Sequence, residues 1–446
     1  MPTPAPKRAT SLTQNLRQIR QQLSQIDLNL PARQSGFLRR SPRKIPMFNF
    51  LLGLLALAAE CCLSLERAAA VIGLTAQTSY TKQALCKRLN DRIERFLAQV
   101  ALILFGQQSQ SPDLRGWLQP FGRVLLHDST TQALPAHLAK VFPGSSNQRS
   151  NQQAAVKVQL IGDLRTATLF HLSLSGFRRN DQAAAPDILE VVQRGDLIIR
   201  DLGYWALHVF EAILLKGAHF LSRYRHGTTL YDPLTGRELN LATLLRRHGS
   251  LDQQVLLGAQ QKLAVRLVAV PVPEAVANER RRRARANRDR RLNPSPARLF
   301  LLGWNIFVTS VDRQTWPPKA IQPIYRLRWR IEIVFKAWKS HLGFRELNCR
   351  SARLLRLSLM TKLLFCVLVY QACNHLELIG SEARHVSLLR LARICAECSA
   401  LVAAAILGVS PQEWLAHQLD SHVFYEKRKD RRNFYEMLAE LARPLG

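Results

Sequence analysis

The sequence has few acidic residues for its size. Its 446 residues include 32 Asp and Glu against 63 Lys and Arg, which gives a formal net charge of +31 and a pI near 10.8. A charge of this sign attracts polyanions, and charge alone leaves DNA, RNA and an anionic membrane as alternatives. The composition therefore predicts a polyanion-binding protein.

Long apolar runs and disulfide spacings are also missing. The run at residues 47–59 is shorter than the roughly 18 to 20 residues that cross a bilayer, and Asn49 interrupts it. The amino-terminal residues contain no secretory signal pattern. Cys395 and Cys398 lack the second pair of ligands that a zinc site needs. We expect buried thiols in a reducing compartment, no membrane partner, and a cytoplasmic protein.

The apolar pattern divides the chain into five regions. Residues 1–110 have the three-and-four spacing of helices and form a predicted DNA-binding region. Short strand-like runs with intervening helices fill residues 111–225, and residues 226–304 form an irregular, β-rich insertion. Residues 305–350 complete the core, and residues 351–446 are helical, with a predicted role in dimerisation or DNA contact. The predicted fold class is α/β, a mixed sheet with flanking helices between helical ends.

Within the first region, residues 64–97 predict two helices joined by a turn at Gly73. Ser64 is a suitable cap for the first helix. The second helix begins with polar and cationic residues, as a DNA recognition helix would: Ser79, Tyr80, Thr81, Lys82, Lys87 and Arg88. Two helices joined by a glycine also describe an ordinary bundle, and both interpretations stay open.

Two apolar runs in the core each end on an acid. Residues 122–130 (GRVLLHDST) predict a strand that ends on Asp128, and residues 197–200 predict a strand followed by Asp201. Between them, residues 154–174 predict a hairpin with its turn at Gly162 and Asp163, followed by a helix at residues 187–193.

The insertion carries a strongly basic run. Residues 279–291 (ERRRRARANRDRR) predict a loop that faces nucleic acid, with a solvated loop as the alternative. The following residues, 298–311, are strand-like. Arg223 and Arg225, at the entry to the insertion, are candidates for DNA contact or for solvated surface.

Residues 325–340 (YRLRWRIEIVFKAWKS) predict one amphipathic helix. At about 100° per residue, its polar stripe lies on one outward face, opposite a buried aliphatic side. The stripe consists of Tyr325, Arg328, Glu332 and Lys339. Because it faces outward, Arg328→Ala and Lys339→Ala should leave the fold intact. An ordinary ion pair between Arg328 and Glu332, four residues apart, is the alternative.

Acids that follow neighbouring strands of a sheet lie at one edge, where a glutamate on a later helix can join them. Asp128, Asp201 and Glu332 would then form a three-carboxylate site for two divalent cations, which prefer oxygen ligands. His127, beside Asp128, would either tune this site or play a structural part.

The residues of the stripe also carry a family resemblance. The spacing Tyr325-x2-Arg328-x3-Glu332-x6-Lys339 resembles the YREK signature of the IS4 family of bacterial DDE transposases in every letter and gap. The sequences HDST around Asp128 and RDLGY around Asp201 are similar to that family's surroundings of its first two acids, and so is the long gap that follows Asp201.

This resemblance implies an RNase H-like catalytic core with Asp128, Asp201 and Glu332 as ligands of two Mg²⁺ ions, for which Mn²⁺ can substitute. It implies a cut-and-paste transposase, a homodimer in a synaptic complex, that cleaves at terminal inverted repeats, forms DNA hairpins and joins the ends to target DNA. The DNA-contacting residues would be Tyr325, Arg328, Lys339, Lys336, Trp329 and Trp304. Trp304 would capture a flipped base or, alternatively, belong to the core.

Two other functions remain as alternatives. A metal-dependent nuclease or resolvase would keep the fold but transfer no strand. A catalytically inactive relative would bind DNA only.

Overall fold

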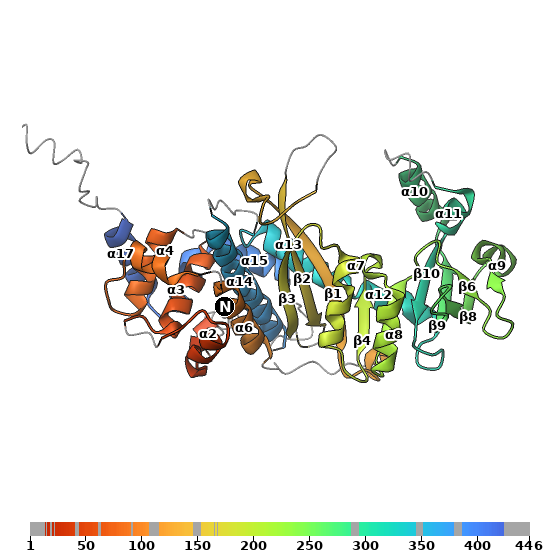
Figure 1. Ribbon diagram of the computed structural model, residues 1–446, viewed down its shortest axis with the longest axis horizontal. Helices are drawn as coiled ribbons and strands as arrows, with labels where there is room; N and C mark the ends of the chain where they lie inside the picture. The colour runs from red at the N-terminus through yellow and green to blue at the C-terminus, as the bar shows by residue number, and fades with distance from the viewer. Residues whose placement is uncertain are drawn as a thin grey trace, which may run out of the picture. The chain divides into compact units, whose positions relative to one another are not determined.

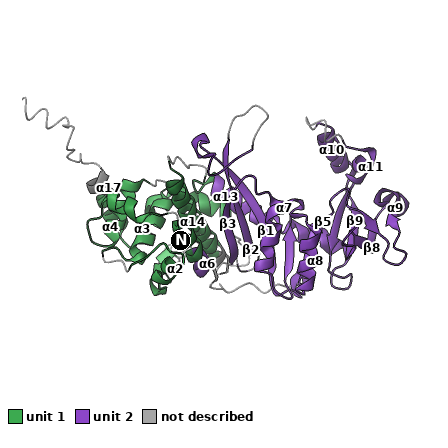
Figure 2. Cartoon of the chain, viewed as in Figure 1, with its two compact units in different colours: residues 1–100, 340–376, 381–446 green, residues 101–339, 377–380 purple. Residues whose placement is uncertain are grey.

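A computed structural model provides the structure of the protein (Figure 1). It describes residues 14–422, except for residues 15, 18, 19, 22, 41–43, 61–63, 91, 107–115, 146–152, 165, 167, 287–293, 345–350 and 379–385. The chain forms two compact units, one of residues 1–100, 340–376 and 381–446 and the other of residues 101–339 and 377–380 (Figure 2).

The first unit is helical in its described part. Its helices come wholly or mostly from the two ends of the chain: α2 (Asn29–Gln34), α3 (Met47–Ala59), α4 (Leu65–Thr75), α5 (Lys82–Arg88), α6 (Ile93–Gly106), α14 (Ala352–Leu378), α15 (Leu388–Glu397), α16 (Ser399–Leu407) and α17 (Pro411–His422). Helix α16 packs against α3, and α3 packs against α4, so the two ends share one core. The helical patterns predicted for both ends are confirmed within the described residues, and residues 1–13 and 423–446 lie outside them.

The predicted two-helix element of this unit differs in detail. Ser64 caps α4 as expected. The turn predicted at Gly73 is wrong, because α4 continues past it; a Cβ at Gly73 would lie 2.7 Å from the carbonyl oxygen of Thr78, so the glycine lets the next loop pack closely. Helix α5 is short, and its Arg88 donates a hydrogen bond to the carbonyl oxygen of Ile45 at 3.1 Å. This cation of the predicted recognition helix is therefore used in packing.

The second unit is built on one ten-stranded sheet of order β3-β2-β1-β4-β5-β10-β9-β8-β6-β7. Its strands are β1 (Val124–Leu134), β2 (Ala154–Asp163), β3 (Leu169–Gly176), β4 (Leu197–Arg200), β5 (His219–Arg223), β6 (Leu230–Tyr231), β7 (Glu238–Leu239), β8 (Leu251–Leu257), β9 (Leu263–Pro271) and β10 (Trp304–Thr309). Strand β4 pairs in parallel with β1 and β5, and the other pairings are antiparallel. The predicted mixed sheet is confirmed.

Helices cover both faces of the core part of this sheet. On one face, α7 (Asp181–Ala184), the 3-10 helix η3 (Ala185–Glu190) and α8 (Leu207–Leu215) form an apolar core with the strands. Val308 points into that core, so its neighbour Phe307 points to the other face. There Phe307 lies 5.2 Å from the ring of Tyr325 in α12 (Pro318–Arg326). Helix α12 and α13 (Trp329–Ser340) therefore belong to the face opposite α8.

Two of the predicted core elements are shifted. Strands β2 and β3 form the predicted hairpin, but β2 runs through Gly162 and Asp163, and its turn comes after them. The helix predicted at residues 187–193 starts earlier, because Asn180 caps α7 with a side-chain bond to the N–H of Ala183 at 2.8 Å. It has ended by Glu190.

The β-rich insertion continues the core sheet. Strand β10 pairs with β5 on one side and with β9 on the other, so the insertion strands extend the sheet. A short helix, α9 (Leu241–His248), precedes β8. The strand-like run at residues 298–311 is a strand only from Trp304 onward, because Ser295 caps a helix, α11 (Pro296–Leu301), before it.

The basic run of the insertion is helical where it is described. Helix α10 (Glu274–Arg285) contains its first residues, so the predicted loop is wrong there, and residues 287–291 lie outside the described part. Ion pairs from Glu279 to Arg282 (2.8 Å) and to Arg283 (2.6 Å) have the i,i+3 and i,i+4 spacing that stabilises helices. The carboxyl-terminal basic stretch at residues 426–436 is also outside the described residues.

The described cysteines differ in their exposure. Cys366, Cys373 and Cys395 are buried as predicted, whereas the prediction is wrong for Cys86 and Cys398, which are exposed. No single helix in the described part of the chain is long and apolar enough to cross a membrane; residues 399–407 and 411–417 meet that criterion only as a pair, with a bend of 99° between them.

Candidate active site

The parallel pairing of β1 and β4 brings the first two acids together. His127 of β1 is in register with Arg200 of β4, so the residues that follow them, Asp128 and Asp201, are neighbours at the same end of this pair. Strand β1 does not end on Asp128, as the sequence predicts, but continues to Leu134 as the partner of β2. The acids therefore mark the end of the parallel pairing.

The guanidinium of Arg328 joins these acids to the third. Its Nη1 lies 2.9 Å from Oδ2 of Asp128, and its Nη2 lies 2.5 Å from Oε1 of Glu332. Its Nε is 3.9 Å from Oδ1 of Asp201. The Arg328 side chain is only 10% exposed. The sequence left an ordinary ion pair between Arg328 and Glu332 as an alternative to a functional role. This ion pair is present, but it is only one of several contacts that Arg328 makes with the acids. We call the group of Asp128, Asp201, Glu332 and Arg328 the acid cluster.

A break in the predicted helix explains why the side chain of Arg328 points inward, towards the acids. Helix α12 ends at Arg326 and α13 begins at Trp329, so Tyr325 and Arg328 do not share one continuous helix with Glu332. The backbone N–H of Arg328 bonds to the carbonyl of Tyr325 at 3.2 Å, a tighter turn than an α-helix makes. The outward stripe is therefore wrong for Tyr325 and Arg328, which are both buried.

The other predicted DNA-contacting residues of α13 lie at different depths. Trp329 is 59% exposed and Lys336 is exposed, whereas the ammonium of Lys339 donates a hydrogen bond to the carbonyl of Thr131 in β1 at 2.7 Å. The structure thus places Tyr325 and Arg328 beside the acids, Lys339 against β1, and Trp329 and Lys336 at the surface.

Burial raises the pKa of two groups in this site. It raises the pKa of Asp128 to about 6, and the nearby Asp201 and Glu332 add to this, although the Ser129 N–H and Arg328 oppose it. Burial and Asp201 also raise the pKa of Tyr325 to about 12. The Tyr325 hydroxyl therefore keeps its proton at neutral pH and donates it to Oδ1 of Asp201 at 3.3 Å.

The residues that precede the acids face the other side of the sheet. His127 is fully buried, and its ring lies 4.1 Å from that of Tyr204. Burial and the charge of Arg200 hold the pKa of His127 well below its ordinary value, so the imidazole is neutral. His127 points away from the carboxylates, which favours the structural role over direct tuning of the site.

Sequence reasoning missed a carboxylate that contacts Ser129, the neighbour of Asp128, on the His127 side of the sheet. Asp181, at the start of α7, lies 2.7 Å from Nζ of Lys157 and accepts a hydrogen bond from the Ser129 hydroxyl at 2.6 Å. A Cβ at Gly203 would approach its Oδ2 to 3.0 Å, so Asp181 is also close to the loop after Asp201. The signal in the sequence was Asn180, a helix cap before an acidic first turn.

The three acids have the ligand chemistry that a divalent cation prefers, but their side chains are not arranged around a common metal position. Carboxylate oxygens are the ligands that Mg²⁺ and Mn²⁺ prefer. Among the described residues, however, no group of three or more His, Cys, Asp or Glu side chains is arranged to hold a metal ion. The cation that the acids share in this structure is the guanidinium of Arg328. The carboxylates therefore have the chemistry that a divalent cation needs, while the arrangement in this structure pairs Asp128 and Glu332 with Arg328.

The predicted base-capturing residue belongs to the insertion. The indole Nε1 of Trp304 donates to the carbonyl of Gly249 at 2.8 Å, and its ring lies 4.5 Å from that of Phe300. Trp304 is partly buried against the apolar core of the sheet. Arg223, exposed at the end of β5, is 5.5 Å from the ring of Tyr325 and so lies beside the acid cluster.

Comparison with known proteins adds a family to this geometry. Residues 119–369 match the transposase DDE domain family. The chain is 28% identical over 285 residues to the transposase for insertion sequence element IS231F of Bacillus thuringiensis subsp. israelensis, which covers 59% of each chain. It is 26% identical over 340 residues to the transposase for insertion sequence element IS1151 of Clostridium perfringens, covering 70% of this chain and 71% of the relative.

The matched part of the chain contains the complete acid cluster. The chain spans about six tenths of the length of the IS231 relatives. For example, the match to the transposase for insertion sequence element IS231B of Bacillus thuringiensis subsp. berliner covers 62% of that protein. Domains of the matched family generally use divalent metal ions, which prefer oxygen ligands such as the carboxylates of the acid cluster. Because the family match extends over more than half of the chain, this chain belongs to the family of transposases with a DDE domain.

Proposed function

We propose that this protein is a cut-and-paste transposase of the IS4 family, acting on the terminal inverted repeats of an insertion sequence. The observation that carries this proposal is the acid cluster, in which Asp128, Asp201 and Glu332 come from distant parts of the chain to one guanidinium. The complete YREK spacing and the names of the relatives support it. In this proposal the three acids hold two Mg²⁺ ions, or Mn²⁺ in their place.

The proposed reaction is a series of displacements at phosphorus. Water cleaves one strand at each end of the element, the freed 3′-hydroxyl attacks the opposite strand to close a hairpin, water reopens the hairpin, and the 3′-hydroxyl joins target DNA. Divalent cations bound by the carboxylates supply charge neutralisation for the attacking and leaving oxygens. The carboxylates themselves must be ionised to bind them, so Asp128, whose pKa is raised to about 6, must first lose its proton.

The remaining residues of the site have roles in holding DNA. Arg328 can exchange a carboxylate for a phosphate because both are oxyanions that accept two parallel hydrogen bonds. Tyr325 contributes a hydroxyl that remains protonated beside Asp201. Lys339 positions the strand beside β1, while exposed Lys336 and Trp329 contact DNA further out. Trp304 captures a base that leaves the helix.

The proposed assembly is a homodimer that pairs two ends in a synaptic complex. In it, residues 1–110 bind the terminal repeats and residues 351–446 mediate dimerisation or contact DNA. The net charge of +31 suits this partner, because each phosphate neutralised by a Lys or Arg releases counterions. The protein would work on DNA of the nucleoid.

The test is a cleavage assay on DNA that carries the ends of the element. With Mg²⁺, the wild-type protein should give nicks, hairpins and joined products. Asp128→Asn, Asp201→Asn and Glu332→Gln should each slow cleavage on the order of a thousandfold, which corresponds to losing several kcal/mol of transition-state stabilisation. Glu238→Gln, an exposed acid of the insertion, is the control.

Different outcomes separate this function from the two alternatives. Nicks without hairpins or joined products would indicate a nuclease of the same fold. DNA binding without any cleavage by the wild-type protein would indicate an inactive relative. Unchanged cleavage in all three acid variants would show that the assignment of the metal ligands is wrong.

A further inference from the structure

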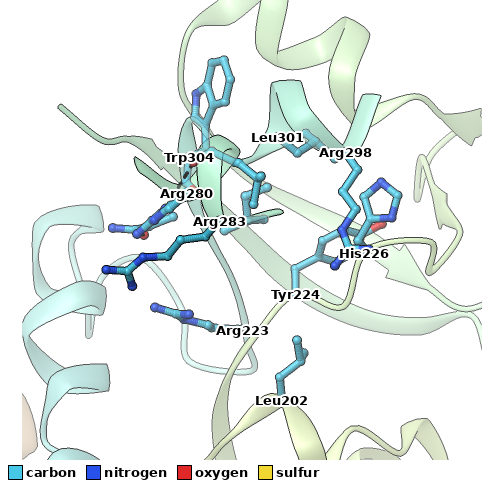
Figure 3. Close-up of a pocket in the computed structure, with 12 residues that line it drawn as sticks. Leu202, Arg223, Tyr224, His226, Arg280, Arg283, Arg298, Leu301 and Trp304 are labelled. Carbon is cyan, nitrogen blue, oxygen red and sulfur yellow. Dashed lines mark hydrogen bonds between the residues drawn. The ribbon is translucent and has the colours of Figure 1, made fainter. Parts of the chain in front are cut away.

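A cavity of about 390 Å³ that is lined by arginines lies where the insertion meets the core strands (Figure 3). Four of them, which we call the arginine pocket, come from three elements: Arg223 from the end of β5, Arg280 and Arg283 from α10, and Arg298 from α11. None of the described residues that line the cavity is acidic. Cationic groups therefore face a shared space without a carboxylate among them.

Two of the groups that line the cavity have lowered pKa values. Burial and the charge of Arg223 lower the pKa of Arg280. Burial and the charge of Arg298 likewise lower the pKa of His226, which also lines the cavity. Mutual repulsion of this kind is relieved when an anion enters. The pocket is thus electrostatically prepared for a negatively charged ligand.

Internal hydrogen bonds hold part of the pocket in place. The guanidinium of Arg280 donates to Oδ1 of Asn305 at 2.8 Å and to the carbonyl of Trp304 at 3.3 Å. Arg283 is tethered to Glu279 on its own helix, at 2.6 Å. By contrast, no described carboxylate forms an ion pair with Arg223 or Arg298 within the part of the chain that the structure covers. Fixed donors beside unpaired ones suit a ligand with several oxygen acceptors.

The arginine pocket adjoins the acid cluster. Leu202, the residue after Asp201, lines the cavity. The guanidinium of Arg223 lies 5.5 Å from the Tyr325 ring, whose hydroxyl bonds to Asp201. Figure 3 shows the side chains of Arg223, Arg280 and Arg283 extending to the same side of the cavity, while the indole of Trp304 points away from them. A strand lying along the acids would therefore pass these guanidiniums.

We propose that the arginine pocket binds the sugar–phosphate backbone of the DNA strand next to the acid cluster, at phosphates beyond the one that is cleaved. The choice of DNA as the polyanion rests on the proposed function, while the phosphate chemistry rests on the pocket itself. Guanidiniums bind phosphate oxygens in pairs, and such contacts set the position of a strand without reading its sequence.

A matched pair of variants tests this proposal. Arg282 and Arg283 are neighbours on α10, both pair with Glu279, and their side chains are 77% and 78% exposed, but only Arg283 lines the cavity. The dissociation constant of the full-length protein for a labelled DNA duplex of mixed sequence is measured at several salt concentrations, with EDTA present. Arg283→Gln should weaken binding severalfold and reduce the salt slope by about 0.9. Arg282→Gln should change neither quantity appreciably.

Arg298→Gln should repeat the effect of Arg283→Gln from a different helix. Equal effects of Arg282→Gln and Arg283→Gln would overturn the proposal, because they would indicate general surface charge. Unchanged slopes in Arg283→Gln and Arg298→Gln would also overturn it. If these two variants weaken the binding of pyrophosphate or of an RNA duplex but not of the DNA duplex, the pocket binds phosphate from another source and the assignment to DNA is wrong.

The outcome is independent of catalysis. Because EDTA removes divalent ions, the slope change of Arg283→Gln should also appear in the Glu332→Gln background. A failure of cleavage in the wild-type protein would contradict the proposed function while leaving this binding result intact. A normal cleavage reaction together with an unchanged salt slope would contradict only the arginine pocket.

Discussion

The acid cluster and the arginine pocket are adjacent regions of one unit with opposite balances of charge. In the acid cluster, three carboxylates share the guanidinium of Arg328. In the arginine pocket, four guanidiniums and a histidine face a cavity with no acid in its described lining. The same residue type therefore lies between carboxylates in one place and, in the other, lines a cavity with no carboxylate among its described residues.

The difference shows that arginines in the two regions have different physical effects. A buried arginine between carboxylates neutralises them and holds their positions, so removing it leaves uncompensated charge. Exposed arginines around a cavity repel one another and contribute little to stability until an anion arrives. Substitutions in the first region should thus affect folding, and those in the second should affect binding.

The largest effect is expected at Arg328. Arg328→Met removes the cation shared by three carboxylates, one of them largely buried, and should lower the free energy of unfolding by about 3 kcal/mol. Urea denaturation at neutral pH measures this change. Arg326→Met, an exposed arginine two positions earlier, should have little effect. The sequence alone predicted that Arg328 faces outward and that its substitution leaves the fold intact. Equal stabilities of Arg328→Met and Arg326→Met would support that prediction instead.

A smaller effect with a defined pH dependence is expected at Asp128. Its pKa of about 6 lies above its value in the unfolded chain, so its contribution to stability is full below about pH 4 and is lost as the pH rises towards 6. Asp128→Asn, which resembles the protonated acid, should therefore be more stable than wild type above pH 6 by about 2 to 3 kcal/mol. The difference should vanish near pH 4. A difference that is constant with pH would show that Asp128 titrates normally.

Variants of Trp304 distinguish a role in packing from a role in DNA binding. Trp304→Phe keeps an aromatic ring but removes the hydrogen bond to the carbonyl of Gly249, and should lower the free energy of unfolding by about 1 kcal/mol. Chemical denaturation of both proteins gives this value. In the cleavage assay, Trp304→Ala should slow hairpin formation and leave the first nick normal. Equal slowing of both steps would instead assign Trp304 to the core alone.

The smallest effects on stability are expected at the exposed face of α13. Trp329→Ala and Lys336→Ala should each change the free energy of unfolding by less than about 0.5 kcal/mol, because neither side chain is buried. Both should nevertheless weaken DNA binding in a titration. Lys319→Gln on α12, which is also exposed, serves as the control. Equal affinities in all three variants would remove Trp329 and Lys336 from the proposed DNA-binding surface.

Local patterns in the sequence were enough to predict parts of the elements that hold the acids, but not all of their ends. The apolar run before Asp201 is strand β4, and the aliphatic side of residues 331–338 is buried as predicted. The mixed sheet followed from alternating strands and helices. The predictions were wrong where side-chain caps moved the start of a helix, as at Asn180 and Ser295.

The candidate site could be only partly predicted, because a helical wheel assumes one continuous helix. The chain turns at Leu327 and Arg328, and this turn directs Tyr325 and Arg328 inward. The basic run was similarly taken for a loop, although its spacing of Glu279 and the following arginines is typical of a helix. The arginine pocket was missed because its side chains come from separate elements.

The sequence by itself determined the charge of the chain, the acids at Asp128, Asp201 and Glu332, and the spacing of the YREK residues, since these depend only on composition and local order. Tertiary structure decided that the acids share Arg328 and that four arginines surround one cavity. The reason is that strand register and the packing of distant helices, rather than distance along the chain, determine which charges meet.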